Sequence, residues 1–211
     1  ESGMEVIRQI FPKLNMTPGI LLAPGWSENA LVSAGLQAKT SHINGIFNCV
    51  CIVDIDSSTA GATKYDDVKR QKEKQAVTSA NCYAVWLYAK VGDVIYAGSA
   101  MAAAATVATD ANNGDIPNVS PDNKPISISA ACLKDGTEVL LDQEQANVVN
   151  SFGVATWLNM NGFRLWGNNT AAYPGNTDPK DRWFCCRRFF SWWGNSFILT
   201  YKQKVDEPGN Y

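Results

Sequence analysis

The chain has 211 residues and a mass of 23.0 kDa, a length that fits a single domain. Hydrophobic residues make up 45% and charged residues 18%, which excludes an intrinsically disordered chain. The formal net charge is −2, so no strongly basic field is available to hold a nucleic acid, and we expect no nucleic-acid partner. No apolar run approaches the length of a membrane span, so we expect no membrane partner either.

The cysteines and the single histidine limit the metal chemistry that the chain can perform. The apolar settings of the cysteines predict buried, reduced thiols, and their spacing does not match the paired C-x2-4-C pattern of zinc sites. His42 lies in a polar stretch and is predicted to be solvated at a helix end, with a catalytic base as the alternative. We therefore expect neither a metal nor a cofactor. The cysteines concerned are Cys49, Cys51, Cys82, Cys132, Cys185 and Cys186.

Apolar runs and turn clusters predict the first elements in chain order. After a mixed segment interrupted by two prolines, strands are expected at residues 19–23, 46–55, 83–90 and 93–97. Helices are expected at 30–38 with Ser27 as its N-cap, at 65–77 and at 99–110, before a loop at 112–125. The charged run at 65–77 is interpreted as a solvated helix face, with a partner-binding patch as the alternative.

The last third predicts a short strand, a helix, a hairpin and a long helix. A brief strand is expected at 138–141, followed by a helix from Asp142 to Asn150 that Gly153 ends. Two further strands, 154–159 and 163–166, flank the hairpin signal Asn161-Gly162, and an aromatic helix runs from Asp181 to about Lys202. This alternation predicts an α/β fold with a layered, mainly parallel sheet flanked by helices, a C-terminal hairpin and a long helix.

One stretch resembles a protease motif but lacks its nucleophile. Residues 98–103, Gly-Ser-Ala-Met-Ala-Ala, resemble the Gly-Thr-Ser-Met-Ala segment of subtilisin-like proteases. The position of the nucleophilic serine is Ala100, which has no hydroxyl group. That family also runs in the order Asp, His, Ser, whereas His42 precedes Asp54 here. We therefore expect that the chain is not an enzyme.

A second stretch keeps an enzymatic alternative open. Asp54 and Asp56 stand two residues apart at a predicted strand end, where both carboxylates would face one side and could hold Mg²⁺. No glycine-rich phosphate loop accompanies them. The alternative reading is an α/β hydrolytic or metal-dependent enzyme with a site near Asp54, Asp56 and Ser99.

The C-terminal third resembles the tail sheath proteins of contractile phages and related contractile particles. The similar pattern is a helix ending in Asn, a Gly-Val step, a short strand, G-F-R-x-W-G-x-x-T, and an aromatic helix with two arginines. The N-terminal part agrees in its strand, Pro24-Gly25 turn and helix, and the resemblance covers roughly residues 19–205. Asn169 departs from the family, which usually has Arg there. The matching positions are Asn150, Gly153, Val154, Gly162, Phe163, Arg164, Trp166, Gly167, Thr170, Arg187 and Arg188.

The resemblance implies a domain division: an N-terminal segment at 1–18, a sheath core α/β domain at 19–205, and a linker at 206–211 to a missing C-terminal domain. The resemblance also implies a subtilisin-like fold without protease activity, as in known sheath cores, and this accounts for the similarity of residues 98–103 to the protease segment. The motif residues at 162–170 and Arg187-Arg188 are interpreted as maintaining the fold, with direct subunit contact as the alternative.

The resemblance also implies a structural function. Sheath subunits assemble in rings around a tail tube, shorten the assembly by rigid-body rearrangement, and add terminal arms as strands to neighbouring sheets. The implied partners are other copies of the subunit and the tube and baseplate proteins. The implied location is a virion tail or related contractile particle, assembled in the bacterial cytoplasm. The long helix carries more aromatic residues than one buried stripe needs, so we expect part of it to contact a missing domain or a neighbouring subunit.

Overall fold

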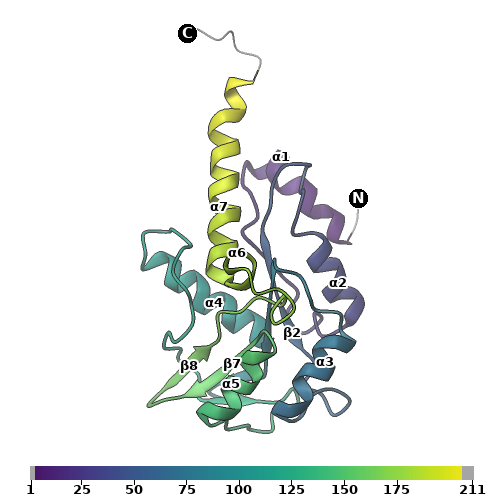
Figure 1. Cartoon of the computed structure of the whole chain (residues 1–211), viewed down its shortest axis with the longest axis vertical. Helices are drawn as coiled ribbons and strands as arrows, with labels where there is room; N and C mark the ends of the chain where they lie inside the picture. Colours follow the sequence, from purple (N-terminus) through teal and green to yellow (C-terminus); the bar gives the residue numbers. More distant parts are fainter. Residues whose placement is uncertain (1–2, 206–211) are drawn as a thin grey trace.

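A five-stranded sheet forms the centre of the molecule (Figure 1). The computed structural model describes residues 3–205, and the predicted linker at 206–211 lies outside them. The strand order is β1-β2-β3-β7-β8; the first four strands are parallel and β8 is antiparallel to β7. The predicted α/β fold with a mainly parallel sheet and a C-terminal hairpin is therefore confirmed. The strands are β1 Ile20–Leu22, β2 Val50–Ile55, β3 Cys82–Trp86, β7 Val154–Asn159 and β8 Phe163–Trp166.

Helices cover both faces of this sheet, and the strands between them are buried accordingly (Figure 1). Every residue of β2 and β3 is buried, as expected for strands covered on two sides. On one face lie α4 and α7, and α2 and α3 lie on the other. The helices here are α2 Ala30–Ala38, η2 Tyr65–Asp67, α3 Val68–Lys74, α4 Gly98–Ala111, α5 Gln143–Ser151, α6 Pro179–Arg182 and α7 Phe184–Tyr201.

The N-terminal segment is helical, and the C-terminal helix extends beyond the sheet. The segment contains η1 Gly3–Gln9 and α1 Ile10–Leu14. The predicted aromatic helix is confirmed as α7, although it begins at Phe184 and not at Asp181, because the extended Trp183 separates it from α6. It is followed by η3 Lys202–Lys204 and extends past the sheet in Figure 1. Among residues 3–205, no helix combines the length and apolar character needed to cross a bilayer.

The single strand predicted at 83–90 is wrong, because the backbone breaks at Leu87. Leu87 has a φ of 87°, in the left-handed region, and this redirects the chain out of the central sheet. The residues after it form β4 Tyr88–Val91, which belongs to a separate three-stranded sheet of order β5-β4-β6. A continuous apolar run carries no signal of such a break. The other strands of this small sheet are β5 Val94–Tyr96, as expected, and β6 Ala130–Cys132.

Two further local predictions are wrong. Residues 138–141 do not form a strand: only Glu138 makes a bridge, to Cys132, and the strand lies earlier, at β6. Its sequence, Ala-Ala-Cys, has too little β propensity to be recognised. Asn29 caps α2 in place of Ser27, because the Asn29 Oδ1 accepts from the Leu31 N–H at 2.9 Å. The Ser27 side chain is directed into the interior.

Candidate functional site

The buried cluster around Asp54 is the position at which an α/β enzyme would hold its site, beyond the carboxyl ends of the parallel strands. Asp54 is 2% exposed, and its carboxylate accepts three hydrogen bonds. The Ser99 N–H donates to Oδ1 at 2.6 Å, and the hydroxyls of Ser99 and Ser27 donate to Oδ2 at 2.6 and 2.8 Å. The Ser27 hydroxyl oxygen also accepts from the Asp54 N–H at 2.9 Å. The structure thus brings Asp54 and Ser99 together, as the enzymatic alternative requires.

The chemistry of this cluster is that of a tertiary helix cap. Ser99 lies in the first turn of α4, whose N–H groups have no partners within the helix, and the Asp54 carboxylate accepts one of them from the neighbouring strand. Burial raises the pKa of Asp54 above its usual range, while the hydrogen bonds from Ser99 and Ser27 oppose that shift. The hydroxyl proton of Ser99 is already directed at Asp54, so the geometry fixes the start of α4.

His42 cannot complete a triad with these residues. It is exposed, has a φ of 56°, and precedes β2, whereas Asp54 lies near the carboxyl end of β2. A six-residue strand spans roughly 20 Å, so the imidazole is far outside hydrogen-bonding reach of Ser99. Its predicted exposure is confirmed, although it lies beyond the end of α2, which has Lys39 as its C-cap.

Asp56 stabilises a turn through its side chain. The cysteines are free thiols, four of which are buried. The Asp56 Oδ1 accepts from the Ser58 N–H at 2.9 Å, closing the turn that follows β2. Within residues 3–205, no group of three or more His, Cys, Asp or Glu side chains is arranged to hold a metal ion. Four cysteines are buried, and burial raises the pKa of Cys49 to about 12; Cys185 and Cys186 are half-buried, and all six thiols are free.

The motif residues at 162–167 lie on the β7–β8 hairpin and its exit. Gly162 has a φ of 113° at the hairpin turn, and its N–H donates to the Asn159 Oδ1 at 3.0 Å. Phe163 is half-buried against the core. The Arg164 Nη1 donates to the Asn123 carbonyl at 2.9 Å, and the Trp166 Nε1 donates to the Asn147 Oδ1 at 2.8 Å. These contacts are all made inside the chain.

Gly167 and Thr170 connect the hairpin to the core and to α6. Gly167 has a φ of 129°, its N–H donates to the Asp122 Oδ1 at 2.7 Å, and its carbonyl accepts from the hydroxyl of buried Tyr83 at 2.5 Å. The Thr170 hydroxyl donates to the Asp181 carbonyl at 2.5 Å. A Cβ atom at Gly167 would lie within 3.3 Å of Ala155 and Asn150, so a larger residue has no space there.

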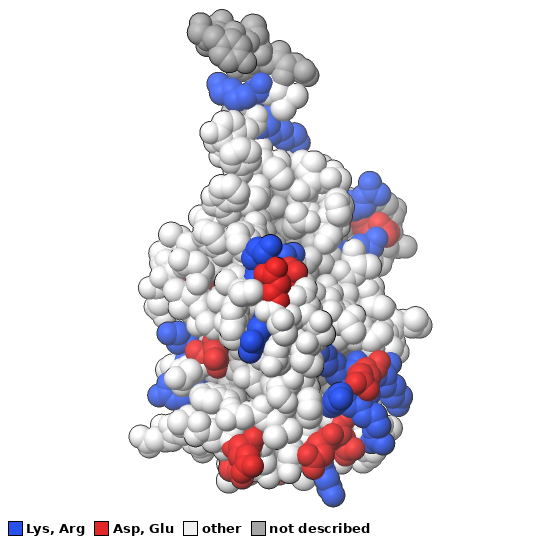
Figure 2. Space-filling view, viewed as in Figure 1, with Lys and Arg blue, Asp and Glu red and all other residues white. Residues whose placement is uncertain are grey.

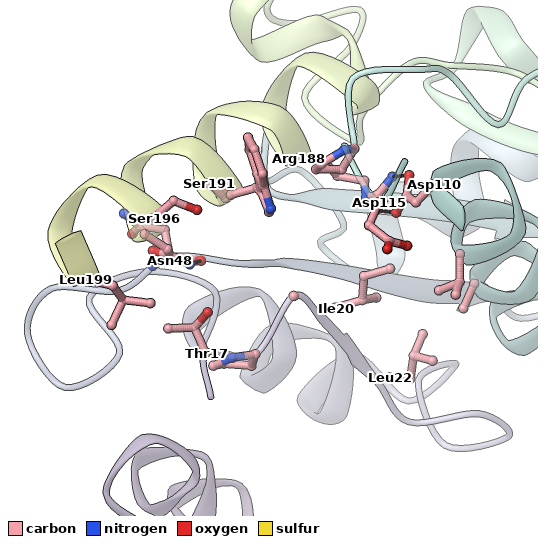
Figure 3. A pocket seen from close by; sticks show the side chains of 17 residues that line it. Thr17, Ile20, Leu22, Asn48, Asp110, Asp115, Arg188, Ser191, Ser196 and Leu199 are labelled. Carbon is pink, nitrogen blue, oxygen red and sulfur yellow. Dashed lines mark hydrogen bonds and ion pairs between the residues drawn. The ribbon is translucent and has the colours of Figure 1, made fainter. Parts of the chain in front are cut away.

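The two adjacent arginines attach the start of α7 to different parts of the fold. Arg187 donates to the Asn81 Oδ1 at 2.6 and 3.0 Å and to the Asp181 Oδ1 at 3.0 Å. Arg188 is buried and forms a two-pronged ion pair with Asp110 of α4, with one N···O distance of 3.0 Å. Figure 3 shows Arg188 and Asp110 side by side at one end of a cavity of about 540 Å³ between β1, α4 and α7.

Beyond these anchors, α7 presents a row of exposed aromatic side chains, which we call the aromatic stripe. Phe190, Trp193, Phe197 and Tyr201 are 46–55% exposed and recur at intervals of three and four residues, which places them on one helix face. Three of the rings contact one another: those of Trp193 and Phe197 lie 5.7 Å apart between centroids, and those of Phe197 and Tyr201 lie 4.4 Å apart. The aromatic excess was predicted from sequence, but the stripe was not.

A second exposed apolar surface lies on the small sheet and was missed from sequence. All residues of the β4–β5 turn and β5 are exposed, including Val91, Val94 and Tyr96. Val91 pairs with Val94 across the hairpin, and Tyr96 lies on the same face because it is two residues from Val94. We call Val91, Val94 and Tyr96, with Asp93 at the turn, the hairpin patch. The consecutive apolar residues Val94, Ile95 and Tyr96 predicted a short extended segment, and nothing in this run indicates that neither of its faces is fully covered.

Comparisons with known proteins match this fold to sheath structures. No protein-family model matches the sequence, and no curated protein is significantly similar to it. A chain of the anti-feeding prophage baseplate has a TM-score of 0.69 and 17% identity over 97% of this chain and 51% of its own length. The PVC sheath complex of an extracellular contractile injection system, in the contracted state, has a TM-score of 0.68 and 18% identity over 97% of this chain and 53% of its own.

A crystal structure from Desulfitobacterium hafniense agrees with these matches at greater sequence distance. This sheath tail protein has a TM-score of 0.61 and 9% identity, over 96% of this chain and 43% of its own. The chain therefore spans about half the length of the solved structures that it matches. The resemblance inferred from the hairpin motif is confirmed in three dimensions, and the chain has the fold of contractile sheath proteins.

Proposed function

We propose that this chain is the core of a structural subunit of a contractile sheath, and that it acts mechanically. The observation that carries the proposal is the fold match, which extends over 97% of the chain and includes a sheath complex in its contracted state. The chain would assemble with its own copies in rings around a tail tube and meet a baseplate, within a virion tail or related contractile particle assembled in the bacterial cytoplasm. Contraction would rearrange whole subunits while each core keeps its fold.

The distribution of contacts supports a rigid building block. The motif residues from Gly162 to Thr170, together with Arg187 and Arg188, contact partners inside the chain, so we assign them to maintenance of the core. They fix the hairpin and the start of α7 to the sheet. A core with these anchors can transmit force without changing shape, because packed interiors have low compressibility.

The enzymatic alternative has one favourable feature, the contact between Asp54 and Ser99, and the surrounding geometry weighs against it. Both serine hydroxyls near Asp54 donate to that carboxylate, and the carboxylate caps α4. A fluorophosphonate probe is expected to leave Ser99 unlabelled. Stoichiometric labelling of Ser99 would establish a nucleophile and overturn the assignment to a non-enzymatic protein.

Electron microscopy of the protein at its full natural length, expressed with a tail tube, tests the proposal directly. Tubes or stacked rings are expected. Dispersed monomers at every concentration would contradict the proposal, since a sheath subunit must form a repeating lattice with itself.

A further inference from the structure

Two consecutive cysteines, Cys185 and Cys186, place two thiols at the start of α7. Both residues are half-buried and lie in the first turn of the helix, directly after Phe184. The Cα atoms of consecutive residues are about 3.8 Å apart, so the backbone keeps the two thiols near each other. Burial raises the pKa of Cys186, and the neighbouring Cys185 thiol raises it further through its charge and a hydrogen bond. The two thiols form a close pair, which we call the α7 dithiol.

Side-chain contacts hold the first turn of α7 in place around this pair. The Asn168 Nδ2 donates to the Cys185 Sγ at 3.3 Å, and the Asn168 Oδ1 accepts from the Cys185 N–H at 3.3 Å. Phe184, before the pair, and Arg188, one turn later, are both buried. The dithiol is therefore presented by a fixed helical turn and not by a loop, and sites on helices hold their ligating atoms more accurately than sites on loops.

The helix disfavours a disulfide within this pair. Disulfides join Cα atoms that are about 4.4–6.8 Å apart, whereas those of consecutive residues are only about 3.8 Å apart. An S–S bond between Cys185 and Cys186 would therefore distort a turn that its neighbours hold in place. An atom inserted between the two sulfurs makes the bridge longer and relieves this restriction. The α7 dithiol is thus better suited to bind a ligand through both sulfurs than to form a disulfide.

A second pair of thiols lies inside the central sheet and is closed to ligands. Cys51 of β2 and Cys82 of β3 are partners in the strand register, and a hydrogen bond with Cys82 contributes to the raised pKa of Cys51. Both residues are 0% exposed. Within residues 3–205, the α7 dithiol is therefore the close pair of thiols that has part of its surface open to a ligand.

The surroundings of the dithiol restrict what it can bind. Zinc takes four ligands in structural sites, and within residues 3–205 no third His, Cys, Asp or Glu side chain joins these thiols in a metal-binding group. The carboxylates that contact the first turns of α7 are already paired, Asp181 with Arg187 and Asp110 with Arg188. Figure 2 shows acidic and basic side chains together over α6. The partial positive charge of the helix N-terminus also opposes a divalent cation. The favoured ligand is uncharged and needs only two thiols.

Trivalent arsenic meets these conditions. It is a soft centre that prefers sulfur ligands, and it forms three bonds. An arsenic atom that carries one organic group is therefore completed by two thiols, and the product is neutral. We propose that Cys185 and Cys186 form a chelating site for trivalent arsenicals. The inference concerns the single chain and goes beyond its proposed role in a sheath.

The binding reaction balances without any further reagent. An arsine oxide, R–As=O, forms one As–S bond with each thiol while its As=O bond breaks. The two thiol protons leave with the oxygen as one water molecule. Arsenic stays trivalent throughout, so the step needs neither an oxidant nor a reductant.

Intact-mass spectrometry of the reduced protein with phenylarsine oxide tests the site. One equivalent of the reagent is expected to give one adduct per chain, with the mass of the arsenical less one water molecule. Cys185→Ser and Cys186→Ser are each expected to bind about a hundredfold more weakly, because the second As–S bond forms at the high effective concentration of a linked thiol. An excess of dimercaptopropanol, a competing dithiol, is expected to remove the adduct.

Cys132→Ala provides the matched control. Cys132 is buried on β6 in the small sheet and lies outside both thiol pairs, so its replacement is expected to leave the adduct and its affinity unchanged. Circular dichroism and urea titration check that each variant is folded. Full affinity in either Cys185→Ser or Cys186→Ser would overturn the proposal, as would the absence of an adduct with the unmodified chain.

Alkylation mapping locates the site without any substitution. The native chain is treated with N-ethylmaleimide, with and without one equivalent of phenylarsine oxide, and the labelled peptides are identified by mass spectrometry. Cys185 and Cys186 are expected to be labelled in the free chain and protected by the arsenical. Protection of Cys51 and Cys82 in their place would contradict the assignment. Failure of Cys185 and Cys186 to react in the free chain would show that the pair is closed to ligands, and would also reject it.

Discussion

The two halves of α7 differ in how their side chains are satisfied. In the first half, Phe184 is buried in the core and Arg188 is buried against Asp110. In the second half, three rings of the aromatic stripe, those of Trp193, Phe197 and Tyr201, contact one another on an exposed face, opposite the buried Asn195. A single helix thus combines an anchored part with an unpartnered part. The comparison teaches that the aromatic residues of one helix can have two roles, packing in the core and forming an exposed surface. The burial of each side chain distinguishes these roles.

The largest expected effect comes from removing a ring in the anchored half. Phe184 is fully buried and stacks on Tyr83 with centroids 4.2 Å apart. Phe184→Ala should lower the free energy of unfolding by about 3–5 kcal/mol, because the lost apolar burial leaves a cavity. Phe197→Ala, in the stripe, should change it by about 0.5 kcal/mol or less. Urea titrations of both variants check the contrast, and equal losses would show that the two halves are not distinct.

The ion pair between Arg188 and Asp110 is the next contact to break. Arg188→Ala leaves the largely buried carboxylate without its cation, so we expect a loss of about 3 kcal/mol in unfolding free energy. Arg188→Met/Asp110→Leu, which removes both charges, should recover most of that loss. The measurement is again chemical denaturation, and a double variant as unstable as the single one would show that the packing of the guanidinium, and not its charge, holds α7 to α4.

The sequence predicted those elements whose signals lie in neighbouring residues, and it missed those that depend on contacts between distant residues. The helix after Asp142 was predicted because Asp142 is a typical N-cap residue and Gly153 ends the helix, and the β7–β8 hairpin because Asn161-Gly162 lies between two apolar runs. The break at Leu87 and the contact of Ser27 with Asp54 were missed. Both depend on residues that are distant in sequence, and a continuous apolar run or a lone serine does not reveal them.

The same limit applies to the candidate sites. The sequence placed Asp54 at a strand end and Ser99 at a helix start, and the parallel topology brings them together. It did not indicate whether their contact would serve chemistry or structure, because that depends on burial and on the absence of a nearby base. It indicated that α7 has too many aromatic residues for one buried stripe, and only the packing of the helix shows which of them are exposed.

A smaller effect is expected at the cap of α4. Ser99→Ala removes one hydroxyl donor from the buried Asp54 carboxylate and keeps the N–H donor, so the unfolding free energy should fall by about 1–2 kcal/mol. Ser127→Ala, at an exposed position before β6, is a suitable control that should change stability little. A loss of assembly without a loss of stability in Ser99→Ala would indicate that the residue acts beyond the cap.

The subtlest expected effect is the pH dependence that Asp54 contributes. Burial raises the pKa of Asp54, so the folded chain binds a proton at this site more tightly than the unfolded chain does. The contribution to stability is therefore fully present below the ordinary aspartate pKa of about 4, and it is lost as the pH rises from there through the raised value. In Asp54→Asn, which does not titrate, this decline should be missing. Denaturation series of both proteins across this range provide the measurement. Parallel pH profiles would mean that the donors from Ser27 and Ser99 offset the cost of burying the charge.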